Sequence, residues 1–215
     1  MMYEHTLKTA MISSALMFMM TTAPPTAEAT HISFPMIVSP GASSCLPNAS
    51  AQVDIISQTP DGQAEDMFIV ATGLPASTGF DFFVIQVPNA PFGLSWYQGD
   101  MQTNSDGVAT QHFRGRFSIE TFIIAPGVAS APQVFTDPPF PDATQNPATL
   151  GPDGKTPGPV QTYHLGLWFN SPTDAKNNGC PSTVTPFNGE HNAGIQVLNT
   201  ANYPDTQGPL IGLSP

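Results

Sequence analysis

The sequence has few charged residues, and basic residues are the scarcest of them. Only 10% of the 215 residues are charged, and five Lys and Arg stand against sixteen Asp and Glu, for a formal net charge of −11. Such a surface repels nucleic-acid phosphates and anionic lipids, because close approach releases no counterions. We therefore expect no nucleic-acid partner, and we expect solubility to depend on uncharged polar residues.

Long apolar runs and long helical patterns are also missing. After residue 29 no segment stays apolar over the roughly 18 residues that a membrane helix requires, so we expect no membrane span. The 24 prolines would interrupt most helices. One helical turn is predicted, at residues 173–178.

The N-terminal residues have the features of an export signal. Lys8 precedes an apolar run at residues 10–20, which is too short to span a bilayer, and an A-x-A cleavage pattern follows at residues 27–29. We predict a signal peptide at 1–29 and a secreted, extracellular product that begins at Thr30. Residues 30–215 have the usual length of a single domain.

Cys45 and Cys180 are the only cysteines. An even number of cysteines in an exported chain favours a disulfide, and two separate buried thiols are the alternative. We predict a structural Cys45–Cys180 disulfide that closes a long loop of the chain.

Alternation with a period of two dominates the rest of the sequence. Runs rich in β-branched and aromatic residues predict strands. They cover residues 52–57, 66–72, 80–87, 117–124, 161–169 and 194–198. The prediction is an all-β fold, an antiparallel β-sandwich of immunoglobulin-like type. Residues 126–160 contain nine prolines and little apolar patterning, so we expect an inserted Pro-rich loop there.

Two segments carry turn signals of known types. Residues 103–107 end in Asp106-Gly107 and predict a hairpin between strands at 96–101 and 108–112, with Gly107 at positive φ. Leu74-Pro75-Ala76-Ser77-Thr78-Gly79-Phe80 resembles the L-P-x-x-T-x-Y corner of fibronectin type III and related immunoglobulin-like domains. Phe80 stands at the tyrosine position, so the hydroxyl hydrogen bond of that corner cannot form here.

Longer stretches carry a broader resemblance. Residues 80–101, 163–172 and 180–200 are similar to a family of exported bacterial proteins without assigned function, expected to adopt an immunoglobulin/fibronectin-III-like β-sandwich. The resemblance implies export and no activity.

Strong catalytic motifs are absent: the sequence contains no G-x-S-x-G, H-E-x-x-H, C-x-x-C or G-x-G-x-x-G pattern. The strand pattern at 163–169 places His164, Gly166 and Trp168 on one face. These side chains could form a flat platform for a sugar ring. The alternative is a central strand in which Trp168 packs beneath the Pro-rich loop.

Residues 88–100 are dense in aromatic residues and turn formers, among them Phe92, Trp96 and Tyr97. Binding residues concentrate on loops, so we expect this segment to form a recognition surface. The alternative is a rigid corner with a core tryptophan.

Histidines supply the remaining candidates. Glu190 and His191, together with His164 and His112, would bind zinc or copper if the fold brought them together. Glu190 could also act as a general base with His164 as the acid. A polar turn with solvated side chains is the alternative for residues 188–192.

The sequence favours a secreted, non-catalytic binding or structural module without a cofactor. Its expected partner is a carbohydrate or a cell-surface protein, recognised through the loop aromatics. The alternative is an exported metal-dependent or hydrolytic enzyme that uses His164, His191 and Glu190.

Overall fold

The computed structural model describes residues 30–57, 64–90, 92, 94–115, 117, 121–123, 135–136, 159–161, 163–186 and 191–213. The predicted signal peptide and almost all of the predicted Pro-rich loop lie outside these residues, as does Glu190. The backbone of Trp96 is described, but its side chain is not.

The described chain is almost entirely antiparallel β-structure, which confirms the all-β prediction. Nine strands form one continuous sheet in the order β6-β3-β2-β1-β11-β10-β4-β5-β8, and β7 pairs with β9. The strands are β1 (Thr30–Val38), β2 (Ser50–Ser57), β3 (Glu65–Thr72), β4 (Gly79–Ile85), β5 (Leu94–Gln102), β6 (Ala109–Gly115), β7 (Thr121–Ile123), β8 (Phe135–Thr136), β9 (Pro159–Gln161), β10 (His164–Phe169) and β11 (Gln196–Asn199). The immunoglobulin-like arrangement stays a prediction.

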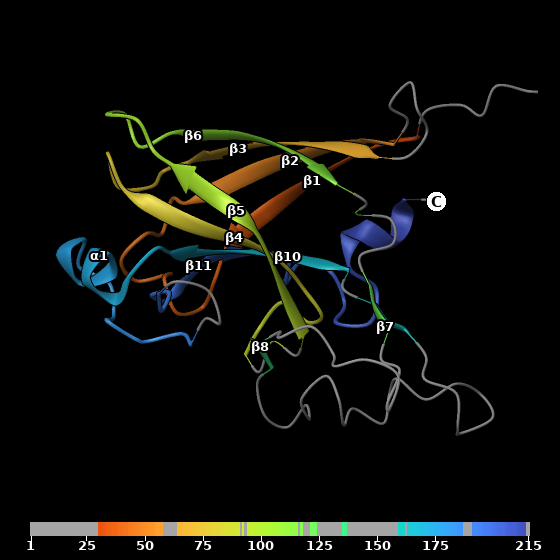
Figure 1. The fold of residues 1–215 in the computed structure, drawn as a ribbon. Coiled ribbons are helices and arrows are strands. Elements are labelled where there is room, and N and C mark those ends of the chain that lie inside the picture. The colour runs from red at the N-terminus through yellow and green to blue at the C-terminus, as the bar shows by residue number, and fades with distance from the viewer. Residues whose placement is uncertain are drawn as a thin grey trace, which may run out of the picture.

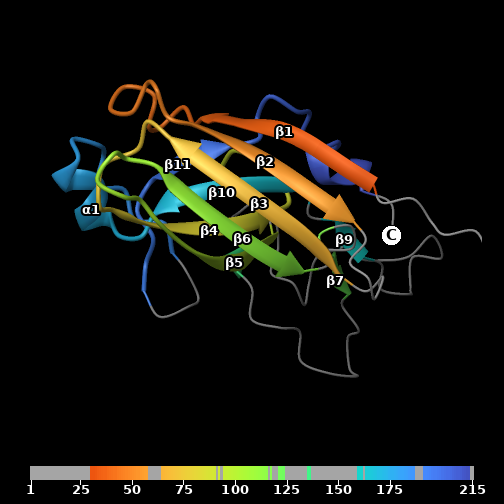
Figure 2. The ribbon, with the colours of Figure 1, turned by 90° about the horizontal axis from the view of Figure 1, so that it is seen from above.

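The sheet folds over on itself. Strands β1, β2, β3 and β6 lie side by side above β11, β10 and β4 (Figures 1 and 2). The two layers are continuous through β1, since Thr30–Met36 pairs with β2 whereas Ile37 and Val38 pair with β11. Side chains from both layers fill the space between them, including Val53, Ile55, Phe82 and Leu167.

The two layers differ in how their outer faces are covered. In β2 and β3 buried residues alternate with residues that reach solvent, as expected for strands with one wet face. In β10 and β11 every residue is buried, so other segments cover the outer face of these strands as well. This covered outer face holds most of the residues discussed below.

The predicted turns are present, but one pairing is wrong. Gly107 has φ 72°, as expected. The hairpin prediction fails, because β5 pairs with β4 and β8 whereas β6 pairs with β3. The 103–107 turn carries the chain from one layer to the other. Thr103 ties it to the corner at residues 74–80: its hydroxyl donates to Pro75 O at 2.6 Å and accepts from Thr78 N at 2.8 Å.

Three further predictions can be compared with the structure. The Cys45–Cys180 disulfide is present and links the segment after β1 to the segment after α1 (Pro172–Asn177), which confirms the predicted pairing. Helix α1 is the predicted helical turn, and Ser171 caps it by accepting from Asp174 N. The strand predicted at 161–169 is two strands, β9 and β10.

Within the described residues, no helix is long and apolar enough to cross a membrane. The last described element is a short 3₁₀ helix, Pro209–Gly212.

Candidate functional site

Strand β10 places His164, Gly166 and Trp168 on one face, as alternation predicted. Directly opposite them on β4 are Ile85, Phe83 and Asp81. Cross-strand partners share a face of a sheet, so all six residues lie on the covered outer face of the lower layer. The platform hypothesis required exposed rings, and the structure instead buries both His164 and Trp168.

Trp168 is only 3% exposed and packs between two phenylalanines. Its ring meets Phe83 at 5.1 Å and Phe92 at 4.9 Å, both edge-to-face. These rings, with Ile85 and Ala193, form a second apolar cluster separated from the main core by the sheet. Trp168 is therefore a buried, packed side chain, as the alternative to the exposed sugar-binding platform predicted.

Gly166 is required for this placement of Trp168. A Cβ atom at residue 166 would lie 2.3 Å from Cζ3 and 2.6 Å from Cη2 of the indole. The benzene edge of Trp168 therefore lies directly over the bare backbone of Gly166. A side chain at this position would force the indole away from the strand.

His164 ties the C-terminal segment to β10. Its Nδ1 lies 2.8 Å from Thr200 Oγ1, and its Nε2 lies 3.2 Å from Pro204 O. Burial lowers the pKa of His164, and the hydrogen bond to Pro204 opposes this effect. A neutral ring with its proton on Nε2 satisfies both contacts, because Nε2 then donates to the carbonyl and Nδ1 accepts from the hydroxyl. This geometry gives His164 a structural role.

The other histidines lie elsewhere. His112, on the outer face of the upper layer, stacks on Phe68 at 4.4 Å and lies 2.7 Å from an Asp66 oxygen. His191 Nε2 lies 3.2 Å from Asp81 Oδ2. Asp81 is opposite Trp168, four residues along β10 from His164, a separation of roughly 13 Å at about 3.3 Å per residue. The structure does not bring these histidines together, and in the described part of the chain no three His, Cys, Asp or Glu side chains are grouped to hold a metal ion.

The loop aromatics have different surroundings. Phe92 is 8% exposed and covers Trp168. Tyr97 is exposed, contacts the Phe83 ring at 5.6 Å, and donates its hydroxyl hydrogen bond to Asp100. Phe92 lines a groove, whereas Tyr97 is not among its lining residues.

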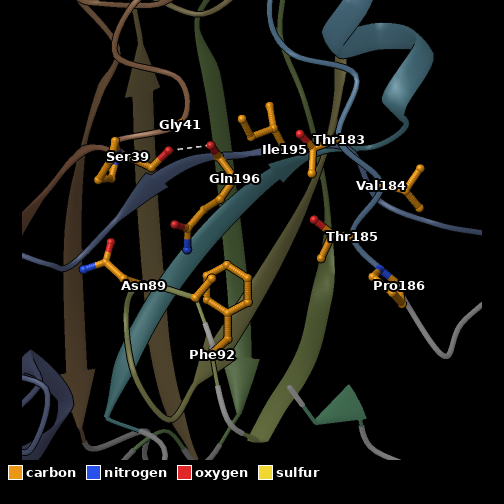
Figure 3. A pocket seen from close by; sticks show the side chains of 12 residues that line it. Ser39, Gly41, Asn89, Phe92, Thr183, Val184, Thr185, Pro186, Ile195 and Gln196 are labelled. Carbon is orange, nitrogen blue, oxygen red and sulfur yellow. Dashed lines mark hydrogen bonds between the residues drawn. The ribbon is translucent and has the colours of Figure 1, made fainter. Parts of the chain in front are cut away.

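This groove has a volume of about 510 Å³. It lies between the segment after β1, the segment after β4 and the segment before β11, and Phe92 lies between Asn89 on one side and Thr185 and Pro186 on the other (Figure 3). The described residues of its lining supply apolar surface with hydroxyl and amide groups, and none of them is charged. The lining residues are Ser39, Pro40, Gly41, Asn89, Ala90, Phe92, Thr183, Val184, Thr185, Pro186, Ile195 and Gln196.

Two buried amides of β11 hold one wall of the groove. Gln196 Nε2 and Asn199 Nδ2 both donate to Pro88 O at 3.0 Å, and Asn199 Nδ2 also lies 3.1 Å from Asn89 Oδ1. Ser39 donates to the backbone oxygen of Gln196 (Figure 3). Movement of this wall would break these hydrogen bonds and leave buried polar atoms without partners. Because that costs free energy, the hydrogen bonds fix the position of the wall.

A small cavity of about 20 Å³ lies next to the groove. Phe92, Thr185 and Pro186 line both spaces, and Phe83, Ser95, Trp168 and Ala193 complete the cavity. Trp168 Nε1 is buried and has no hydrogen-bond partner among the residues that the structure describes. The groove therefore adjoins an aromatic cavity lined by Trp168, whose buried indole N–H makes no hydrogen bond with the described residues.

A carboxyl pair lies beside Trp168 on the same face. Asp81 and Asp100 are cross-strand partners on β4 and β5, and Asp81 has no exposed surface. Burial raises the pKa of Asp81 to about 6, His191 opposes the rise, and Asp100 adds to it. Asp81 is inaccessible, and neither Asp81 nor Asp100 is among the lining residues of the groove.

Asn89 lies in the predicted recognition segment 88–100, whereas Ser39, Gln196 and Asn199 were not predicted as site residues. The available signal was weak: Gln196 and Asn199 are polar residues at the two ends of an apolar four-residue strand. No protein-family model, no curated protein and no solved structure matches this chain.

Proposed function

We propose that the protein is a secreted, non-catalytic binding module whose groove takes an uncharged carbohydrate chain. The lining of the groove supports this most directly. It combines apolar surface, including Phe92, with hydroxyl and amide groups, and no described residue that lines it is charged. A sugar has the matching surface, since its C–H faces are apolar and its hydroxyls form hydrogen bonds.

Two groups on the groove are available for sugar hydroxyls. Asn89 Nδ2 and Thr183 Oγ1 make no hydrogen bond with any other described residue, and both side chains are exposed. The other polar lining groups hold the protein together, as Gln196 does with Pro88. A ligand can therefore bind at the rim without breaking the bonds that hold the wall.

The export signal and the disulfide support an extracellular setting for this function. The apolar run at 10–20 and the A-x-A pattern favour export, and disulfides persist in oxidising compartments. Cell-surface and matrix glycans are accessible ligands there.

A charged residue at the groove rim tests the proposal. Val184 lines the groove and is 53% exposed, so Val184→Asp adds a carboxylate to the rim and leaves the core unchanged. Retention on neutral polysaccharides should fall at least about tenfold, because a desolvated charge in the contact costs more than 1.4 kcal/mol. The matched control is Ile211→Asp at a residue that is 51% exposed and outside the groove. Equal losses in both variants, or no retention of the wild-type protein on any neutral polysaccharide, would overturn the proposal.

A further inference from the structure

The unused indole donor of Trp168 calls for an explanation. Its side chain is 97% buried, and Nε1 has no hydrogen-bond partner among the described residues. Buried tryptophans normally find an acceptor for this proton, and an unsatisfied buried donor costs about 1–3 kcal/mol. A strand that tolerates this cost leaves the donor available to another molecule.

The contacts of the ring show which way the donor faces. Gly166 lies under Cζ3 and Cη2, the benzene edge, so the five-membered ring with Nε1 lies at the end away from Gly166. Next to Trp168 along β10, Gly194 N donates to Phe169 O at 2.7 Å. Ala193 and Thr185, which are joined by a β-bridge there, both line the small cavity.

The cavity has the size of one oxygen acceptor. Its volume of about 20 Å³ is close to the 10–15 Å³ that a single water needs. A carbonyl oxygen fits this space and accepts from Nε1, and it brings no proton of its own that would need a second acceptor. The rings of Phe83 and Phe92 offer an apolar contact for a methyl group beside that oxygen.

The groove and this cavity are adjacent, because Phe92, Thr185 and Pro186 belong to the lining of both. We propose that the glycan bound in the groove carries N-acetylated sugars, and that the carbonyl oxygen of one acetamido group enters the cavity beside Phe92 and accepts the Trp168 Nε1 hydrogen bond. This inference rests on the proposed function and adds the identity of the sugar.

A peptide carbonyl offers the same acceptor, but the surroundings favour a sugar. Extended peptides bind by pairing with an exposed strand edge, and β10 and β11 are each paired on both sides in this region. The groups at the rim, Asn89 Nδ2 and Thr183 Oγ1, are single side-chain groups suited to scattered hydroxyls.

The experiment compares trimers of N-acetylglucosamine and of glucose as calorimetric ligands for the wild-type protein and for Trp168→Phe. The wild type should bind the N-acetylated trimer about tenfold more tightly, the upper end of what one neutral hydrogen bond gives. Trp168→Phe keeps an aromatic ring and removes the donor, so the preference should disappear. Tyr203→Phe, which alters a tyrosine that packs on Phe34, is the matched control and should retain the preference.

Indole proton resonances give a second measurement on the wild-type protein. The chain has two tryptophans, so the Trp96 signal is an internal reference. The N-acetylated trimer should shift the Trp168 Nε1–H signal downfield, whereas the glucose trimer should not. If both trimers bind equally without this shift, the acetamido inference is wrong and the proposed function stands. If neither trimer binds, the acetamido inference fails, and retention of the wild-type protein on neutral polysaccharides decides the proposed function separately. An N-acetylated peptide that binds more tightly than the trimer and produces the shift would replace the glycan with a peptide.

Discussion

Asp81→Asn should make the protein more stable near neutral pH. Asp81 has no exposed surface, and its Oδ1 has no hydrogen-bond partner in the described structure. Asp100 faces it across the strand pair, and His191 Nε2 lies 3.2 Å from the other oxygen. The ionised carboxylate is thus poorly solvated and lies beside a second acidic group, with one imidazole to offset both effects.

The size and sign of the effect follow from the pKa. Burial raises the pKa of Asp81 from 3.8 to about 6, a difference worth about 3 kcal/mol. Below pH 4 the Asp81 carboxyl is protonated in both the folded and the unfolded protein, so its burial does not lower the free energy of unfolding. Between pH 4 and 6 the folded state holds the proton that the unfolded state releases, so stability falls as the pH rises. Above pH 6 the free energy of unfolding stays lower by the full amount of about 3 kcal/mol.

Urea unfolding at pH 4 and pH 7.5 measures this contribution. The free energy of unfolding should drop less between the two pH values in Asp81→Asn than in the wild type, by up to about 3 kcal/mol. Asp54→Asn is the matched control, because Asp54 also lies beside a histidine, His31, but is exposed. His191→Gln should move the pH range of the stability loss upward, since His191 lowers the pKa of Asp81. Identical pH profiles for the wild type and Asp81→Asn would refute the reasoning.

Two further changes test the packing of Trp168 on Gly166 and the contribution of the disulfide. Gly166→Ala should lower the free energy of unfolding by about 1–3 kcal/mol in urea titrations, because the new Cβ would lie 2.3 Å from the Trp168 ring. In Gly212→Ala the nearest atom would be Ile32 Cγ2 at 3.7 Å, so this control should stay within about 0.5 kcal/mol of the wild type, and equal losses would contradict the packing account. The Cys45→Ala/Cys180→Ala double variant should lose about 5 kcal/mol, since the bridge closes a loop with a sequence separation of 135, and a loss under 1 kcal/mol would contradict that estimate.

Local pattern predicted much of the secondary structure. The alternation at 52–57 and 66–72 corresponds to β2 and β3, whose outer faces are wet, and Gly107 has the positive φ that its turn requires. Strand β1 went unpredicted because Pro35 interrupts its pattern. A proline lacks the N–H that pairing on both sides requires, but in its first seven residues β1 pairs with β2 alone among the described strands.

Long-range arrangement could not be read from the sequence. A turn at 103–107 is compatible with a hairpin and with a crossing between layers, because the same residues satisfy both. Alternation predicts that His164 and Trp168 share a face, but it carries no information on whether distant segments cover that face. The groove joins residues 39–41, residues 89, 90 and 92, residues 183–186 and residues 195–196, and no local signal relates these segments.

The polar ends of β11 connect the stability of the fold to the groove. A wall made from a loop is useful for binding only if the loop keeps its position, and loops seldom have enough apolar contact for this. Here Gln196 and Asn199 hold the Pro88 carbonyl from inside the sheet, and Phe92 packs on Trp168 a few residues later. Because this outer face is separated from the main core by the sheet, its residues could change with the ligand while the packing between the two layers stayed intact. The proposed binding surface is therefore built on strands that are buried on both faces, and this explains why amides occupy positions that alternation alone would assign to apolar residues.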